Sequence, residues 1–400
     1  MIELMRYLAV LVLLAAAAVA GDLQGMFHAG NDHPAIQYPS RPTRDPAGLL
    51  NRSLREGKAK LRYDPKFGYL PSLLDALHIP VESQMLVFSK TSVQAQIIHT
   101  RNPRALYFND TVAVGYVGDS GMLEIASQDP ELGTIFYVMH QAQVETPVLD
   151  RRDSCIGCHE TPSSLGVPGW LMRSVHPAAD GLPVRSMGEF RTDHRSAMDE
   201  RWGGWYVTGE SGGAAHMGNM LALNAGKTRV RLSAEVASAH LTPHSDIVAL
   251  TVFGHQVHMT NLLTRAAWEA RVGPGDAALR ELARELVDYL LYIDEPALEG
   301  RLEGTAGFTT KFASMGPLRE FDLERRTMRY PCSYMIYSPA FDALPAALKS
   351  AVYDRLWLVL SGQEKGAKYA RLSLNDRRAV VQILQKTKSG LPEIFKGEIN

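Results

Sequence analysis

The sequence predicts an α+β fold in which the strands come first and the helices last. Five short β-rich runs, separated by turn residues such as Asn-Asp, Gly-Asp and Asp-Pro, cover residues 85–89, 105–108, 111–117, 121–127 and 134–139. Longer segments suited to helix fill the chain beyond residue 245. We therefore expect an N-terminal antiparallel β region, an irregular segment over residues 160–226, and a mostly helical C-terminal part.

Residues 1–20 have the pattern of a secretory signal peptide. Arg6 supplies a basic start, residues 8–17 are apolar but too short to cross a bilayer, and Ala18-Val19-Ala20 is a typical cleavage site. The alternative interpretation is an uncleaved N-terminal anchor. We expect an exported protein, periplasmic or secreted, with no transmembrane segment after signal cleavage.

The rest of the chain divides into three regions. Residues 21–65 form an irregular lead-in, residues 66–240 a β-rich region, and residues 241–395 a helical region packed on the same core. A short helix is expected at residues 70–78 and a further strand at 228–236. Longer helices are expected from Ser245 as N-cap to about 271, and at 276–292, 344–360 and 375–386. Ser373 with Asp376 resembles a capping box.

Composition excludes several classes of protein. The chain has 42 Lys and Arg against 43 Asp and Glu, and no basic block, so we expect no nucleic-acid partner. It has 3 cysteines, too few for a disulfide-built scaffold. We interpret Cys332 as a small buried residue rather than a reactive thiol.

The main chemical motif is Cys155-Ile156-Gly157-Cys158-His159. This C-x-x-C-H spacing is typical of covalent haem c attachment, with two thioethers and His159 as the proximal iron ligand. Zinc would need two further soft ligands, and a redox dithiol would need a βαβ unit; a plain disulfide is the third alternative. No second motif is present, so we expect one haem per chain, wrapped by the irregular segment.

Several side chains are candidates for the sixth iron ligand, and the sequence does not select one of them. Met217 or His216, which are adjacent and flanked by small residues, rank first, followed by His255 or His258 and then His194. Met172, His176 and Met259 are further candidates. Each of these side chains has packing as its alternative role.

Arginines are frequent near the motif and suit the two propionates of a haem. Arg152, directly before the motif, and Arg173 are the expected partners. Arg201 has an alternative role, a cation–π cluster with Trp202 and Trp205.

Beyond the motif, several short segments of the sequence resemble segments in a group of large exported bacterial proteins described as cytochrome c domain-containing. They occupy residues 102–110, 202–207, 216–219, 245–250 and 329–334, and the resemblance covers about residues 65–395. It implies haem and export but no reaction. The resemblance implies residue roles only for Cys155, Cys158 and His159, as the residues that attach the haem and ligate its iron.

Three functions fit this pattern. The first is one-electron transfer to a redox partner protein. The second is a peroxidase-like haem enzyme with an open distal face, using His194 or His216 as acid/base and Arg195 or Arg201 as charge stabiliser. The third is a haem-based sensor or assembly factor. The missing second motif argues against a di-haem peroxidase, while a length of 400 residues exceeds what a simple shuttle needs.

Overall fold

The computed structural model describes residues 25–223, 226–397 and 399. The expected signal peptide at residues 1–20 therefore lies outside the described residues. No helix in the described part of the chain is both long and apolar enough to cross a membrane.

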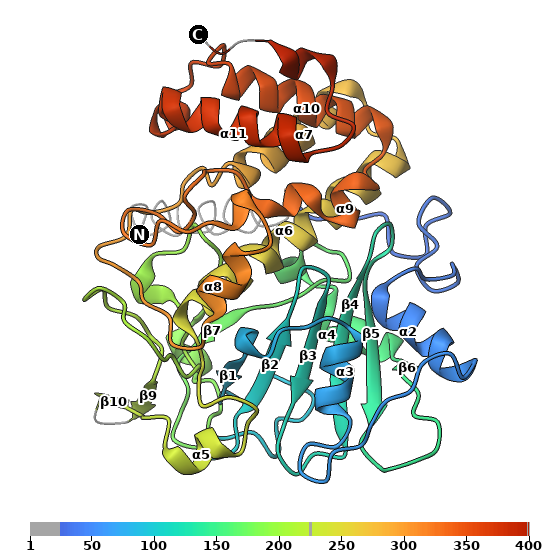
Figure 1. The fold of residues 1–400 in the computed structure, drawn as a ribbon, viewed down its shortest axis with the longest axis vertical. Coiled ribbons are helices and arrows are strands. Elements are labelled where there is room, and N and C mark those ends of the chain that lie inside the picture. The colour runs from blue at the N-terminus through green and yellow to red at the C-terminus, as the bar shows by residue number, and fades with distance from the viewer. Residues whose placement is uncertain (1–24, 224–225, 398, 400) are drawn as a thin grey trace, which may run out of the picture.

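A six-stranded antiparallel sheet forms the N-terminal half of the fold, and its strands follow one another in sequence order (Figure 1). Its strands are β1 Met85–Val87, β2 Arg104–Phe108, β3 Val112–Tyr116, β4 Met122–Asp129, β5 Gly133–His140 and β6 Asp150–Arg151. The first five confirm the β-rich runs of the sequence. β6 pairs with β5 and leads directly to the C-x-x-C-H motif, which confirms that the sheet ends there.

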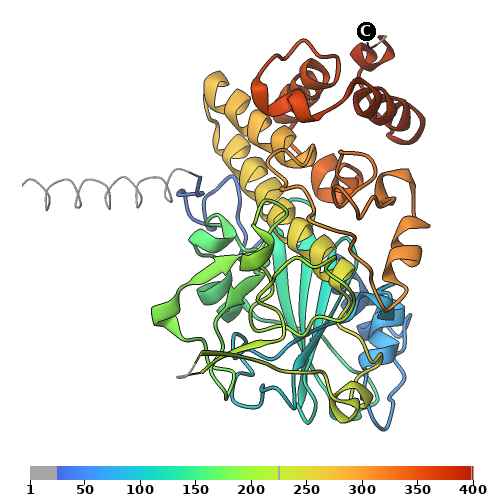
Figure 2. The ribbon, with the colours of Figure 1, turned by 90° about the vertical axis from the view of Figure 1, so that its left-hand side faces the viewer.

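The two faces of the sheet are covered by different elements because side chains alternate along each strand. Ala105, Tyr107 and their equivalents on neighbouring strands pack with helix α3, Leu70–Ala76. Phe108 and Ala113 point the other way and share a core with helix α6, Ile247–Val272. Figure 1 shows α3 over the strands, and Figure 2 shows the long α6 running along the sheet.

The lead-in over residues 21–65 is not wholly irregular, so that expectation was wrong in part. It contains helix α2, Pro46–Arg55, which packs against β4. Asp45 caps this helix by accepting a hydrogen bond from the Gly48 amide at 2.9 Å, and proline follows at the first helical position.

The long helix α6 begins one residue later than expected, because Asp246 rather than Ser245 is its N-cap. The Asp246 carboxylate accepts from the amides of Val248 and Ala249 at 2.8 and 3.0 Å. Almost every residue of α6 as far as Trp268 is buried, so the helix is a central element rather than a surface one. It ends at Val272, and the C-cap residue Gly273 follows with a left-handed φ of +95°.

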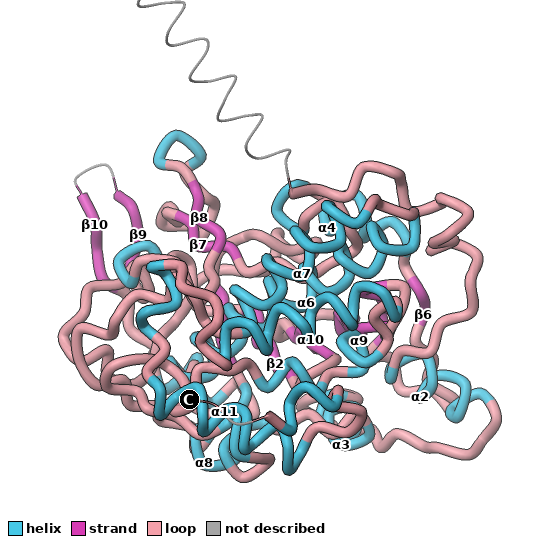
Figure 3. Tube along the Cα trace, turned by 90° about the horizontal axis from the view of Figure 1, so that it is seen from above, coloured by secondary structure: helices cyan, strands magenta, loops and turns pink. Residues whose placement is uncertain are grey.

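Two small hairpins lie in the segment expected to be irregular. They pair β7 Arg173–Val175 with β8 Glu189–Arg191, and β9 Met220–Leu223 with β10 Gly226–Arg229. The expected strand at 228–236 was wrong beyond Arg229, because helix α5, Ala234–Ser238, follows with Ser233 as its cap. Seen from above, the hairpins lie on the opposite side of the molecule from α3 (Figure 3).

The C-terminal part is helical, as the sequence predicts. Its helices are α7 Asp276–Leu290, α8 Phe308–Ala313, α9 Pro339–Asp342, α10 Ala346–Leu360 and α11 Leu374–Thr387. The capping box of Ser373 and Asp376 is present at the start of α11. One buried cluster joins these helices to α6 and to one face of the sheet, so the β region and the helical region share a core.

Short 3-10 turns connect the longer elements. They are η1 Val81–Ser83, η2 Asp153–Cys155, η3 Pro162–Ser164, η4 Arg185–Met187, η5 Met198–Glu200, η6 Pro317–Arg319, η7 Tyr334–Tyr337, η8 Ala367–Arg371 and η9 Glu393–Lys396.

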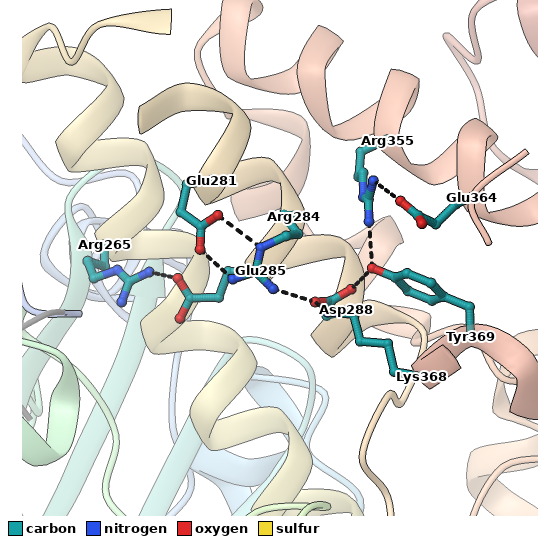
Figure 4. A network of polar contacts seen from close by, with 9 residues as sticks. All are labelled: Arg265, Glu281, Arg284, Glu285, Asp288, Arg355, Glu364, Lys368 and Tyr369. Atoms are coloured by element: carbon teal, nitrogen blue, oxygen red, sulfur yellow. Dashed lines mark hydrogen bonds and ion pairs between the residues drawn. The ribbon is translucent and has the colours of Figure 1, made fainter. Parts of the chain in front are cut away.

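Ion pairs join α7 to its neighbours on the outside of this core (Figure 4). Glu285 of α7 pairs with Arg265 of α6. One turn further on, Asp288 accepts from Tyr369 and pairs with Lys368, both at 2.5 Å. These contacts fix α7 between the central helix and the C-terminal segment.

Candidate haem-attachment site

The C-x-x-C-H motif forms a single helical turn at the end of the sheet. Cys155 ends η2, and helix α4, Ile156–His159, follows it directly. Cys155 and Cys158 are three residues apart in this turn, so they are neighbours on one face. Both thiols are free; Cys155 is partly exposed and Cys158 is exposed. Two adjacent accessible thiols meet the first requirement of a doubly attached haem.

The imidazole of His159 is held in a defined orientation. Its Nδ1 lies 2.9 Å from the carbonyl oxygen of Gly169. A carbonyl only accepts, so Nδ1 carries the proton and Nε2 keeps its lone pair. Burial lowers the pKa of His159, which favours this neutral form. Nε2 makes no hydrogen bond to the described residues and is free to ligate a metal.

The central helix fixes the segment that orients His159. The Gly169 amide donates to the His159 carbonyl at 2.9 Å, which closes a loop between the two residues. Asn261 of α6 binds both backbone groups of Trp170, accepting from its amide and donating to its carbonyl at 2.9 Å each. Since Asn261 is buried, the position of the imidazole depends on a helix about a hundred residues further along the chain.

A row of side chains crosses the sheet beside the motif, and most of it is only partly covered. Four residues on adjacent strands are directly opposite one another in the register: Leu106, Gly115, Glu124 and Val138. We call them the open row, because three of the four are partly exposed while Gly115 is buried. The next row is Phe108, Ala113, Ala126 and Phe136. Gly115 lies in the middle of the open row beside Glu124, and two alanines lie in the middle of the next row, whose Phe108 and Phe136 are buried.

The two rows lie close to the motif. The ring centroid of Phe136 is 4.7 Å from that of His159. Glu124 of the open row raises the pKa of the Cys155 thiol, although burial is the larger cause. The partly exposed apolar side chains of these rows thus lie on the same side of the sheet as the motif.

Glu124 forms the charged part of this surface with Arg104. Arg104 Nη1 donates to Glu124 Oε2 at 2.6 Å, and Ser92 and Gln94 donate to Oε1 at 2.7 and 2.9 Å. Burial raises the pKa of Glu124, but Arg104 and these donors outweigh it, so the net shift is downward. The carboxylate is therefore ionised beside Cys155. Neither residue carries a local sequence signal, because the two meet only through the register of three strands.

The residues expected to bind propionates differ in their surroundings. Arg173 forms an ion pair with Glu189 at 2.9 Å, yet its Nε is buried and has no hydrogen-bond partner. The Nε of Arg104 is buried and unpartnered in the same way. Both arginines lower the pKa of His159. Arg152 is exposed and lines a hollow with Asn51 and Arg55.

These unpartnered donors fit a haem. A buried N–H group without a partner costs free energy unless an acceptor arrives. The two Nε atoms belong to arginines whose charges act on the same imidazole, and propionates are anionic acceptors. The donor set of two thiols, a free imidazole nitrogen and two guanidinium groups therefore matches haem c.

The preferred candidates for the sixth ligand line a cavity of their own. His216 and Met217 lie in a pocket of about 210 Å³ that also includes His176. The Met217 sulfur accepts a hydrogen bond from Ser174 Oγ at 3.6 Å. The ring centroids of His216 and Trp202 are 5.4 Å apart. Neither side chain makes a hydrogen bond or ring contact with the motif within the described residues. Their role as iron ligands stays a prediction.

The other histidine candidates form a cluster around α6. His194 and His255 are buried, and their Nδ1 atoms are 2.7 Å apart; His255 Nε2 lies 2.7 Å from Ser333 Oγ. His258 contacts Arg195 at 3.2 Å, and Arg195 itself pairs with Asp193. Each of these residues therefore has a structural partner.

Three remaining candidates are also packed in the interior. Arg201 donates to the carbonyls of His194 and Ser196. Met172 and Met259 are buried in the core that includes α6.

Cys332 is buried, as the sequence analysis expects of a small core residue. Burial raises the pKa of its thiol to about 12. It is therefore protonated and shielded at neutral pH.

Comparisons of the chain with profiles of protein families, with curated proteins and with solved structures found no match. Within the described residues, no group of three or more His, Cys, Asp or Glu side chains is arranged to hold a metal ion.

Proposed function

We propose that this protein is an exported mono-haem c-type cytochrome whose function is haem binding and one-electron transfer to a partner protein. The proposal rests on the arrangement and accessibility of the three side chains of the motif. Two accessible thiols lie on one helical turn, and the next residue presents a neutral imidazole whose Nε2 is free.

Each residue of the motif has a separate task. Cys155 and Cys158 would hold the haem through thioethers, formed when each S–H adds across a vinyl group without an oxidant. His159 would be the proximal ligand, with Gly169 fixing its tautomer and its ring plane. When bound, the haem supplies a ferric–ferrous couple. Arg173, with its unpartnered Nε, would bind a propionate. Arg152, which lies exposed beside the motif, is the second proposed partner.

Periplasmic or secreted localisation belongs to the same proposal. It rests on the pattern of residues 1–20 and on the chemistry of the motif, because bacterial haem c is attached outside the cytoplasm. Cell fractionation would test this part separately.

Covalent attachment is tested by replacing Cys155 and Cys158 with alanine and staining for haem after denaturing electrophoresis. The unmodified protein, matured with a haem c assembly system, should stain, and the double variant should not. Cys332→Ala is the matched control and should stain normally, because that thiol is buried in the core. Haem that stays bound to the double variant after denaturation would falsify the proposal.

The ligand set is tested by absorbance spectra of both oxidation states with and without carbon monoxide. A low-spin spectrum that ignores carbon monoxide supports two protein ligands and electron transfer. A near-infrared sulfur-to-iron band that is lost in Met217→Leu would assign Met217. A high-spin spectrum that shifts with carbon monoxide would overturn the carrier function.

A further inference from the structure

The charged pair Arg104–Glu124 has no role in the proposed function so far. Both residues lie on the same face of the sheet, Glu124 in the open row and Arg104 at the start of β2. Their ion pair is mostly buried, with side chains 15% and 20% exposed. Burying two charges costs free energy, because their desolvation can exceed their mutual attraction. A mostly buried ion pair at this position therefore suggests a role other than stabilising the fold.

Of the two residues, Arg104 has a buried donor without a hydrogen-bond partner, whereas the acceptors of Glu124 are used. The Glu124 carboxylate accepts from Arg104, Ser92 and Gln94, so its acceptor positions are well used. Arg104 donates through Nη1, but its Nε is buried without a partner. The guanidinium is thus held by Glu124 and still has a donor for an anionic group.

The surface beside the pair is apolar and partly exposed. Leu106 and Val138 of the open row are partly exposed, and Gly115 between them has no side chain. A Cβ on Gly115 would lie 3.4 Å from both Leu106 and Glu124, which would fill the middle of the row. The motif borders this surface through the contact of His159 with Phe136.

We propose that the haem is received on the open row, with Arg104 as a propionate partner and Glu124 as the positioning residue that holds Arg104 and offsets its charge. This inference rests on the proposed function and deepens it. It assigns the two residues whose charges tune the reduction potential. It also supplies an acceptor for the buried Nε of Arg104, which has no hydrogen-bond partner among the described residues.

The test is the midpoint potential of the intact holoprotein, measured by redox titration with mediators. Ferric haem carries one more positive charge than ferrous haem, so a nearby negative charge stabilises the ferric state. Arg104→Gln leaves Glu124 uncompensated and should lower the reduction equilibrium constant about tenfold, which is about 59 mV for one electron. Glu124→Gln leaves Arg104 uncompensated and should raise it by a similar factor.

The double variant Arg104→Gln/Glu124→Gln removes both charges and should return close to the original potential. Arg101→Gln is the control for charge alone, because Arg101 is exposed and should change the potential little. Shifts of equal sign in the two single variants, or shifts no larger than that of the control, overturn the inference. If Arg104→Gln does not fold, Glu124→Gln, which keeps the side-chain shape, decides the question alone.

Failure of the inference is distinguishable from failure of the proposed function. If the unmodified protein carries no covalent haem, the proposed function is wrong and the inference is wrong with it. If haem is attached but the potentials do not respond to these charges, only the inference is wrong.

Discussion

Replacing Asn261 with alanine should destabilise the protein and disturb the His159 site together. The side chain makes two buried hydrogen bonds with the backbone of Trp170, each 2.9 Å long. Without it, one amide and one carbonyl lose their partners where water does not reach. Each orphaned group costs about 1–3 kcal/mol, so the expected loss in the free energy of unfolding is about 2–6 kcal/mol.

Asn51 provides a matched control for this prediction. It makes the same pair of bonds with the backbone of Leu149, at 2.8 and 2.9 Å, but in a partly exposed position. Water can replace the side chain there, so Asn51→Ala should cost only about 1 kcal/mol. Both free energies of unfolding are measured by urea denaturation. The comparison requires that the slope of this free energy against urea concentration is the same in each variant as in the unmodified protein. A loss of stability in Asn261→Ala no larger than in Asn51→Ala would show that burial does not set the magnitude.

The remaining predictions concern buried groups away from the motif. Burial lowers the pKa of His255 to about 3, whereas the unfolded chain binds its proton near pH 6.5, so stability should be full above pH 6.5 and fall as pH decreases towards 3. His255→Gln should reduce this slope by about 1.4 kcal/mol per pH unit, as seen in urea denaturation between pH 4 and 6; an unchanged slope would contradict it. Cys332, whose thiol pKa burial raises to about 12, should resist a thiol reagent at about pH 8 in the native protein and react only after unfolding. Rapid labelling of the native protein would show that the site opens.

The His194–His255 contact adds to this acid sensitivity. Two imidazoles whose nitrogens are 2.7 Å apart share one proton, and burial together with the neighbouring histidine keeps the pKa of His194 well below its usual range. The cluster therefore stays neutral at physiological pH. This suits a packing role between α6 and the Asp193–Arg195 segment better than acid–base catalysis.

Local sequence signals determined most of the elements of this fold. The β-rich runs became β1 to β5 because alternating side chains satisfy two separate cores, one under α3 and one under α6. The capping box of Ser373 and Asp376 fixed the start of α11 through hydrogen bonds within four residues. Errors arose where two signals competed, as at Ser245 and Asp246, where both side chains can cap and only the contacts with neighbouring segments select Asp246.

The sequence by itself also determined that the three side chains of the motif lie together, because Cys155, Cys158 and His159 are close in the chain and need only one helical turn. Their surroundings were decided by the tertiary structure. Arg104 and Glu124 meet through the register of three strands, and Asn261 reaches Trp170 from a helix 91 residues away. Long-range contacts of this kind leave no local pattern, since each depends on how separately formed elements pack. The grouping of the two thiols with the His159 imidazole could therefore be predicted from the sequence, whereas the surface beside them could not.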